Sequence, residues 1–194
     1  MAKEVGVALI EKKIRAPLDA LQYAYEQSKN VTGSSTACLI VLNDNQLTAA
    51  NIGDSQFIVI RNNQIILEST EQQIKFNMPY QIGTDCDLTP KKDAQLYQLS
   101  LQPNDYIIMG TDGLFDNLKT SAMLNSIKKG KCSGIAQDIA NKAFVNSRKK
   151  NIVTPFAKLA KEHNVSWSGG KPDDITVLVA KVVNKQVKGT PKRK

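Results

Sequence analysis

The stretch YIIMGTDGLFDNL, residues Tyr106–Leu118, decides the fold prediction because it joins a strand pattern to two acidic residues. The run YIIMG is short and apolar, as in a buried strand. Asp112 and Asp116 follow it, although an anionic group costs free energy when it loses its water. Two interpretations are open. Either Asp112-Gly113 is turn chemistry and Asp116 begins a helix, or both carboxylates hold a metal ion.

Length and composition indicate one ordinary globular domain. The chain has 194 residues, of which 41% are hydrophobic and 23% charged, enough for one domain with a real core. We expect this domain over residues 1–183 and a disordered basic tail over 184–194. The longest apolar run, Ile175–Val183, is too short for a membrane span and contains Lys181. The N-terminus lacks a signal-peptide pattern, so an intracellular protein is expected.

Cysteine and histidine usage argues against several kinds of site. Cys38, Cys86 and Cys132 lack the paired spacing of a zinc ribbon or a disulfide framework. Reduced thiols in an intracellular protein explain them. His163 is the single histidine, which argues against a histidine-bearing triad and against a histidine-rich zinc site.

The net charge of +8 raises the hypothesis of a nucleic-acid-binding protein. Its lysines and arginines are dense over Ser147–Lys150 and Asn184–Lys194. Aromatic residues make up 6% of the chain and do not interleave with these clusters, whereas a dedicated binder needs a stacking platform or a groove-reading helix. Nucleic acid is therefore not the expected partner.

Apolar periodicity predicts an α+β protein with antiparallel strands. The expected elements, in chain order, are helices over Met1–Ile14 and Pro17–Ser28; strands over Ala37–Leu42, Gln46–Gly53, Gln56–Arg61 and Gln64–Ser69; a long loop over Thr70–Pro90; strands in AQLYQLSL and YIIMG; helices after Asp116, over Ile135–Ser147 and from Thr154; and a last strand after GGKPDD. Asn and Asp between the early strands favour tight hairpins.

Carboxylates recur at the predicted strand ends. Asp54 lies at the junction of two strands, Asp112 and Asp116 at the exit of another, and Asp173 and Asp174 before the last. If those strands are neighbours, the carboxylates converge on one acidic pocket, and such oxygen ligands suit Mg²⁺ or Mn²⁺. Each aspartate is also common in turns and caps, so spacing alone leaves both interpretations open.

Four segments resemble successive motifs of one family. GSSTACLIVL, ANIGDSQFIVIR, GTDGLFDNL and GGKPDDITVLVA, in this order from Gly33, are similar to motifs of the metal-dependent protein phosphatases (PPM, type 2C serine/threonine phosphatases), in particular the mitochondrial-type branch. The resemblance implies an αββα sandwich of two antiparallel sheets flanked by helices. It also implies hydrolysis of phosphoserine and phosphothreonine in proteins by a metal-activated water. The expected compartment is mitochondrial or cytoplasmic.

The resemblance also assigns residues. Asp112 and Asp173 match ligands of the family's Mn²⁺ or Mg²⁺ centre, and Asp116 and Asp54 match positions associated with a more weakly held third metal. Asp174 matches a position with a structural hydrogen bond. No side chain is assigned as a catalytic nucleophile.

One departure from the family concerns the N-terminus. Members begin with an arginine that binds phosphate and a DG-x-GG motif whose aspartate bridges two metals, but the only aspartate before Asp44 is Asp19, on a predicted helix. We therefore expect a domain that lacks its N-terminal part and associates through uncovered sheet edges. A sequence that begins late, a truncated paralogue and a domain completed by another chain are the three explanations. The alternative function is a catalytically inactive pseudophosphatase that acts as an interaction or regulatory module.

Overall fold

Residues 1–184 are described in the computed structural model. Apart from Asn184, the predicted basic tail lies outside them, and the division into domain and tail stays a prediction. The helices are α1 (Ala2–Ile10), α2 (Pro17–Gln27), α3 (Pro90–Asp93), α4 (Asp112–Phe115), α5 (Thr120–Ser126), α6 (Cys132–Ser147) and α7 (Pro155–Glu162), with a 3-10 turn η1 at Ile127–Lys129. None of the helices within residues 1–184 combines the length and the apolar character that crossing a membrane requires.

The strands form two main antiparallel sheets. They are β1 (Ser34–Ser35), β2 (Ala37–Asn43), β3 (Gln46–Ile52), β4 (Gln56–Arg61), β5 (Gln64–Glu68), β6 (Gln73–Lys75), β7 (Met78–Pro79), β8 (Ile82–Gly83), β9 (Gln95–Ser100), β10 (Tyr106–Gly110) and β11 (Val177–Lys181). One sheet has the order β11-β10-β4-β5 and the other β2-β3-β9; β1 pairs with β8 and β6 with β7.

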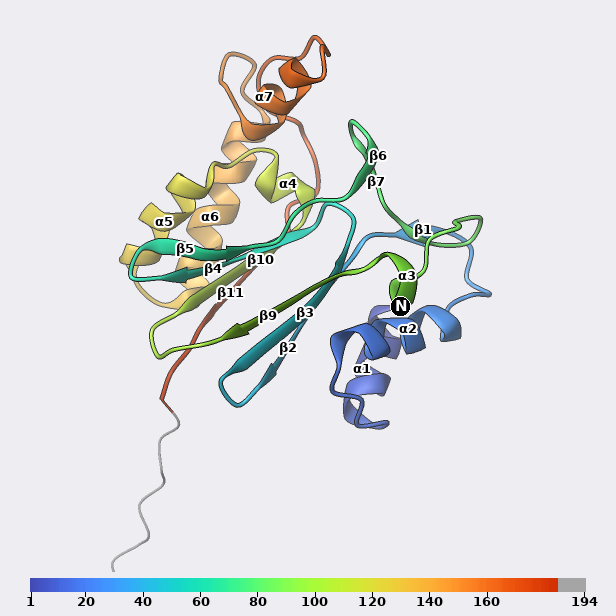
Figure 1. Ribbon diagram of the computed structural model, residues 1–194. Coiled ribbons are helices and arrows are strands. Elements are labelled where there is room, and N and C mark those ends of the chain that lie inside the picture. Colours follow the sequence, from blue (N-terminus) through green and yellow to red (C-terminus); the bar gives the residue numbers. More distant parts are fainter. Residues whose placement is uncertain (185–194) are drawn as a thin grey trace, which may run out of the picture.

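Helices cover the outer faces of both sheets (Figure 1). The first sheet packs against α4 and α6, and α5 packs against α6. The second sheet packs against α2, and α1 lies against α2. This arrangement confirms the α+β class and the αββα sandwich that the resemblance implies.

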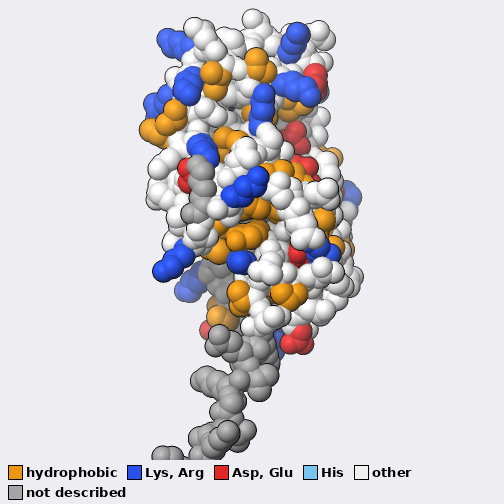
Figure 2. Space-filling view, turned by 90° about the vertical axis from the view of Figure 1, so that its left-hand side faces the viewer, with side chains coloured by type: hydrophobic (Ala, Val, Ile, Leu, Met, Phe, Trp, Pro, Cys, Tyr) orange, Lys and Arg blue, Asp and Glu red, His pale blue; other side chains and the backbone are white. Residues whose placement is uncertain are grey.

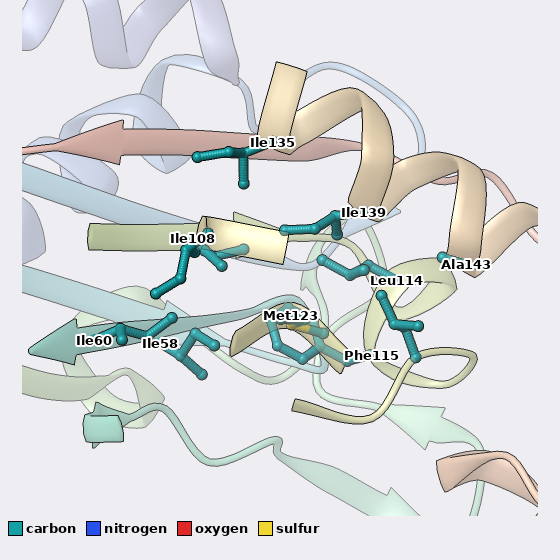
Figure 3. Packing of buried hydrophobic residues seen from close by; sticks show 11 residues of the cluster. Ile58, Ile60, Ile108, Leu114, Phe115, Met123, Ile135, Ile139 and Ala143 are labelled. Carbon is teal, nitrogen blue, oxygen red and sulfur yellow. The ribbon is translucent and has the colours of Figure 1, made fainter. Parts of the chain in front are cut away.

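Two hydrophobic clusters explain why β4 is apolar along its whole length. Ile58 and Ile60 face α4–α6 in the first cluster (Figure 3), whereas Phe57 and Val59 face the second sheet. Alternate side chains of a strand point to opposite faces, so a strand buried on both faces needs a continuous apolar run. β4 and β10 are therefore central strands whose ends are held firmly.

The turn and helix chemistry is largely as predicted. Asp44, Asn62 and Asn63 adopt positive φ of 50–62° in the β2–β3 and β4–β5 hairpins, where Asn and Asp tolerate this conformation. Thr154 is confirmed as the N-cap of α7, since its hydroxyl accepts the Ala157 N–H at 3.1 Å. β4 matches the predicted strand Gln56–Arg61.

Two expectations about local structure were wrong, and so was one part of an interpretation that the sequence left open. The first helix ends at Ile10 and not at Ile14, because Lys13 takes a left-handed conformation that no helix continues. The predicted loop over Thr70–Pro90 contains the β6–β7 hairpin, whose turn residue Asn77 has φ 55°. Asp116 does not begin a helix: α4 begins at Asp112, and Asp116 follows its last residue.

The outer strands of both sheets carry exposed apolar side chains. Within residues 1–184, β2, β9 and β11 each pair with a strand on one side only. Leu42 on β2, Leu96 on β9 and Leu178 on β11 are 53–59% exposed. Figure 2 shows hydrophobic side chains gathered in the middle of one face, with lysines and arginines among and around them. Association through these edges stays a prediction.

Candidate metal centre

The end of β10 places two carboxylates on one side of a short helix. Thr111 precedes α4, Asp112 is the first residue of this helix, and the Asp116 N–H donates to the Asp112 carbonyl at 2.8 Å. Residues four apart in a helical turn lie on the same face. The helical turn therefore directs both side chains of the TDGLFD segment the same way.

A second segment, residues 169–176 before β11, is fixed against α4. Asn117, which is buried, donates to the Lys171 carbonyl at 2.8 Å and accepts the Lys171 N–H at 2.9 Å. The Thr111 hydroxyl donates to the Asp174 carbonyl at 2.9 Å and accepts the Thr176 N–H at 3.1 Å. These bonds position Asp173, between the two fixed points, beside α4.

The approach of this segment to α4 requires a glycine. A Cβ at Gly113 would lie 2.4 Å from the Asp174 carbonyl oxygen, closer than a carbon can approach. The DG pair is thus explained by packing as well as by chemistry: the aspartate faces the site, and the glycine lets the two segments meet.

Three of the predicted site residues converge on one cationic group. The Lys171 ammonium lies 2.8 Å from Asp112 Oδ2, 2.8 Å from Asp116 Oδ2 and 3.5 Å from Asp173 Oδ2. We call Asp112, Asp116 and Asp173 the acidic cluster. Their side chains are 15–34% exposed. An ion can therefore reach these carboxylates from solvent, although the protein shields them partly from water.

Two further carboxylates act on the cluster through charge. Burial raises the pKa of Asp54 to about 6, and the nearby Asp112 charge adds to this shift. Burial likewise raises the pKa of Glu71, which Lys171 partly offsets. Burial also raises the pKa of Asp116 to about 7, against the opposing hydrogen bond from Lys171. Crowded carboxylates of this kind disfavour one another's charge and favour a bound cation.

The outcome for the predicted residues is therefore mixed. Asp112, Asp116 and Asp173 come together, whereas Asp54 lies outside the contacts of Lys171 and interacts with the cluster only electrostatically. Asp174 makes a structural hydrogen bond through its backbone carbonyl. Sequence reasoning missed Lys171, Glu71 and Asn117. For Lys171 a signal existed, since GGKPDD places a lysine two residues before the acidic pair.

The donor chemistry fits a hard divalent cation. The cluster offers carboxylate oxygens alone, and Mg²⁺ and Mn²⁺ prefer such ligands. The described residues, 1–184, hold no group of three or more His, Cys, Asp or Glu side chains in a metal-binding arrangement as they stand. The Lys171 ammonium instead makes the contacts to all three carboxylates. Ligand type thus agrees with a metal centre, and the spacing in this structure is set by a lysine.

A comparison with known protein families identifies the family of this chain. Residues 8–183 match the family described as Stage II sporulation protein E (SpoIIE). The chain belongs to the SpoIIE/PPM phosphatase family. The resemblance of its four motifs to the type 2C phosphatases is thereby confirmed.

Named relatives agree with this family. The chain is 39% identical to "Probable protein phosphatase 2C 80" of Arabidopsis thaliana over 87% of its length, and 38% identical to "Protein phosphatase PTC7 homolog fig" of Drosophila willistoni, also over 87%. It spans 42% and 60% of these two relatives, respectively. The shared part is thus a PPM domain segment within longer proteins.

Solved PPM structures share the fold. The photosystem II phosphatase PBCP superposes with a TM-score of 0.87 at 25% identity, covering 93% of this chain and 76% of its own. The catalytic domain of the serine/threonine phosphatase PstP, in complex with two manganese ions, gives a TM-score of 0.57 at 19% identity, with 92% and 72% covered. The second likeness supports the αββα fold alone.

Proposed function

We propose that this PPM segment serves the metal-dependent hydrolysis of phosphoserine and phosphothreonine in proteins, with Asp112, Asp116 and Asp173 holding Mn²⁺ or Mg²⁺. The observation that carries the proposal is the convergence of these three carboxylates on a single positive charge. Asp54 lies outside this contact set and is proposed to hold a further ion weakly. The relatives named protein phosphatases support the reaction.

The roles of the chain's own residues follow from their geometry. A divalent cation in the cluster would polarise the phosphoryl oxygens and lower the pKa of a water molecule. Asn117 and Thr111 keep Asp173 beside α4 through four hydrogen bonds to the segment before β11. Rigid support of this kind preserves the ligand geometry during the reaction. The substrate is a phosphorylated protein, and the compartment, mitochondrial or cytoplasmic, stays a prediction.

Hydrolysis of a small aryl phosphate and of a phosphothreonine peptide at increasing Mn²⁺ tests the proposal. We expect metal-dependent turnover that falls by at least roughly 100-fold in Asp112→Asn, the scale on which one preorganised electrostatic group acts. Asp44→Asn is the matched control, because Asp44 lies in the β2–β3 turn with φ 50°, where Asn is equally suited. Turnover in Asp112→Asn equal to that of the parent, or turnover that does not depend on Mn²⁺, would refute the assignment.

A second candidate function is a non-catalytic interaction or regulatory module. The specific observation that favours it is that the Lys171 ammonium already lies between the three carboxylates of the acidic cluster. Such a module predicts a folded chain that hydrolyses neither substrate at any Mn²⁺ concentration. The hydrolysis assay therefore separates the two candidates directly, provided that circular dichroism confirms the fold of each sample.

A further inference from the structure

Lys171 makes more charged contacts than any other cation described in residues 1–184. Its ammonium bonds to Asp112 and Asp116 and lies within 3.5 Å of Asp173. It also lies 5.0 Å from the centre of the Phe156 ring, a favourable cation–π distance. Only 15% of the side chain is exposed. The ammonium is thus enclosed by the groups that the proposed function assigns to a metal.

The backbone of Lys171 cannot easily move to release this contact. The Asn117 amide bonds to both the N–H and the C=O of Lys171, and its own amide nitrogen also donates to Gly113 at 2.9 Å. Gly169 and Gly170, just before Lys171, are packed so closely on the end of α6 that a Cβ at either would lie 2.2–2.3 Å from a backbone oxygen. The ammonium can therefore leave the cluster only by rotation of its own side chain.

We propose that Lys171 is a tethered cation that holds the acidic cluster together in the metal-free protein and competes with the divalent ion for it. The inference rests on the proposed function and deepens it, because it names what regulates loading of that site. A single positive charge between three carboxylates relieves their mutual repulsion. Since the lysine is part of the chain, its effective concentration at the cluster is fixed and high.

The competition has a calculable consequence. A site is open to an external ligand only for the fraction of time that the tethered group is absent, and the apparent dissociation constant rises by the inverse of that fraction. An ammonium present for about nine-tenths of the time weakens apparent metal affinity about tenfold. Lys171 thus makes metal loading depend on a high divalent-ion concentration and keeps the unloaded site ordered.

Lys171→Met tests this role, because methionine keeps an unbranched side chain of similar length and removes the charge. We would measure Mn²⁺ binding by the electron paramagnetic resonance signal of the free ion, and thermal unfolding with and without Mn²⁺. We expect Lys171→Met to bind Mn²⁺ about tenfold more tightly. Without metal, we also expect Lys171→Met to melt at a lower temperature than the parent. At saturating Mn²⁺, its melting temperature should rise by more than that of the parent.

Lys158→Met is the matched control. Lys158 lines the same cleft as Asp116, but its recorded ion pair is with Glu162 at 3.7 Å. Loss of this solvent-screened charge should change Mn²⁺ affinity by less than about twofold. Lys171→Gln, which is also uncharged, should follow Lys171→Met and guards against a side effect of the methionine.

The outcomes separate this inference from the proposed function. Tighter Mn²⁺ binding confined to the two Lys171 variants supports it, as does a Lys171 variant that folds only when Mn²⁺ is present. Equal or weaker binding in those variants, with binding retained in the parent, overturns the competition and leaves the metal site intact. Absence of Mn²⁺ binding in the parent and in every variant overturns both.

Discussion

At the scale of single residues, the carboxylates differ in what neutralises them. Asp105, 1% exposed, accepts two hydrogen bonds from Arg61 at 2.8 and 2.7 Å and a third from the Gln102 N–H at 2.7 Å. Burial alone would raise the pKa of Asp105, but the Arg61 and Gln102 hydrogen bonds hold it below its usual range. This pair is structural, in contrast to the acidic cluster, whose shared cation we propose to be exchangeable.

The first prediction concerns this structural pair. Asp105→Asn should lower the free energy of unfolding by about 2–3 kcal/mol at neutral pH, the scale of a hydrogen-bonded charge. A depressed folded-state pKa stabilises the protein above the unfolded pKa, about 4 for Asp, and this stabilisation is lost as the pH falls through the lower folded value. The difference between parent and variant should therefore shrink below about pH 4.

Urea unfolding at several pH values between about 3 and 7 measures this difference, because this range includes the ordinary aspartate pKa of about 4 and neutral pH. The control is Glu162→Gln, which removes an exposed pair with Lys158 on α7 at 3.7 Å and should cost less than about 0.5 kcal/mol. A constant difference across the pH range would contradict the role given to Asp105.

The sequence predicts the site residues better than their neutralising partners. Their position at strand ends indicated Asp112, Asp116 and Asp173 as candidates, but this position also suits turns and caps, and the metal-binding role came from the family resemblance. Glu71 is not readable in the same way, since glutamate is common on any surface, and the one signal for Lys171 is its place two residues before the acidic pair in GGKPDD. The proximity of Lys171 and Glu71 to the cluster depends on segments 54–71, 112–116 and 169–176 meeting in space, which no local pattern encodes.

At the scale of elements, the site depends on the contact between α4 and the segment before β11. The hydrogen bonds of Asn117 and Thr111 and the close approach at Gly113 all join these two elements. The site geometry is therefore a property of this junction as much as of the carboxylates.

Gly113→Ala tests the junction. The added methyl group would lie 2.4 Å from the Asp174 oxygen, so one segment must shift, and overpacking of this kind costs about 1–3 kcal/mol of unfolding free energy. Gly134→Ala in α6 is the control, because no atom lies within 4 Å of the added Cβ and a helical Gly→Ala change stabilises by about 0.5–1 kcal/mol. Chemical denaturation measures both, and the same sign for the two variants would contradict the account.

Elements with strong periodicity or turn chemistry were predictable, and short ones were not. β4 and its Asn-Asn turn follow from an apolar run that ends in residues tolerant of positive φ. The β6–β7 hairpin was not predicted because it is short and is supported by tertiary packing. The Phe76 ring packs against the rings of Phe156 and His163 in the α7 region, with ring centroids 5.2–5.3 Å apart. Such aromatic contacts are long-range and leave no local pattern.

At the scale of the whole molecule, the sandwich explains why the residues of the proposed site lie at one end. The strand ends that lead to Asp54 and Asp112 belong to β3 and β10, one in each sheet. β10 packs into both hydrophobic clusters, and β3 packs into the cluster between the sheets. The layered order was predicted from the family resemblance, whereas the apolar periodicity predicted only the helices and the antiparallel strands. Pairing of β4 with β10, which brings distant segments side by side, came from the structure alone.

The central claim is that Asp112, Asp116 and Asp173 form a divalent-cation site. The most direct test is Mn²⁺ binding to the parent chain, Asp112→Asn, Asp173→Asn and the control Asp44→Asn, measured from the free-ion paramagnetic resonance signal. We predict saturable binding in the parent and in Asp44→Asn, weakened at least roughly tenfold in each cluster variant. Binding of equal strength in all four proteins would contradict the claim.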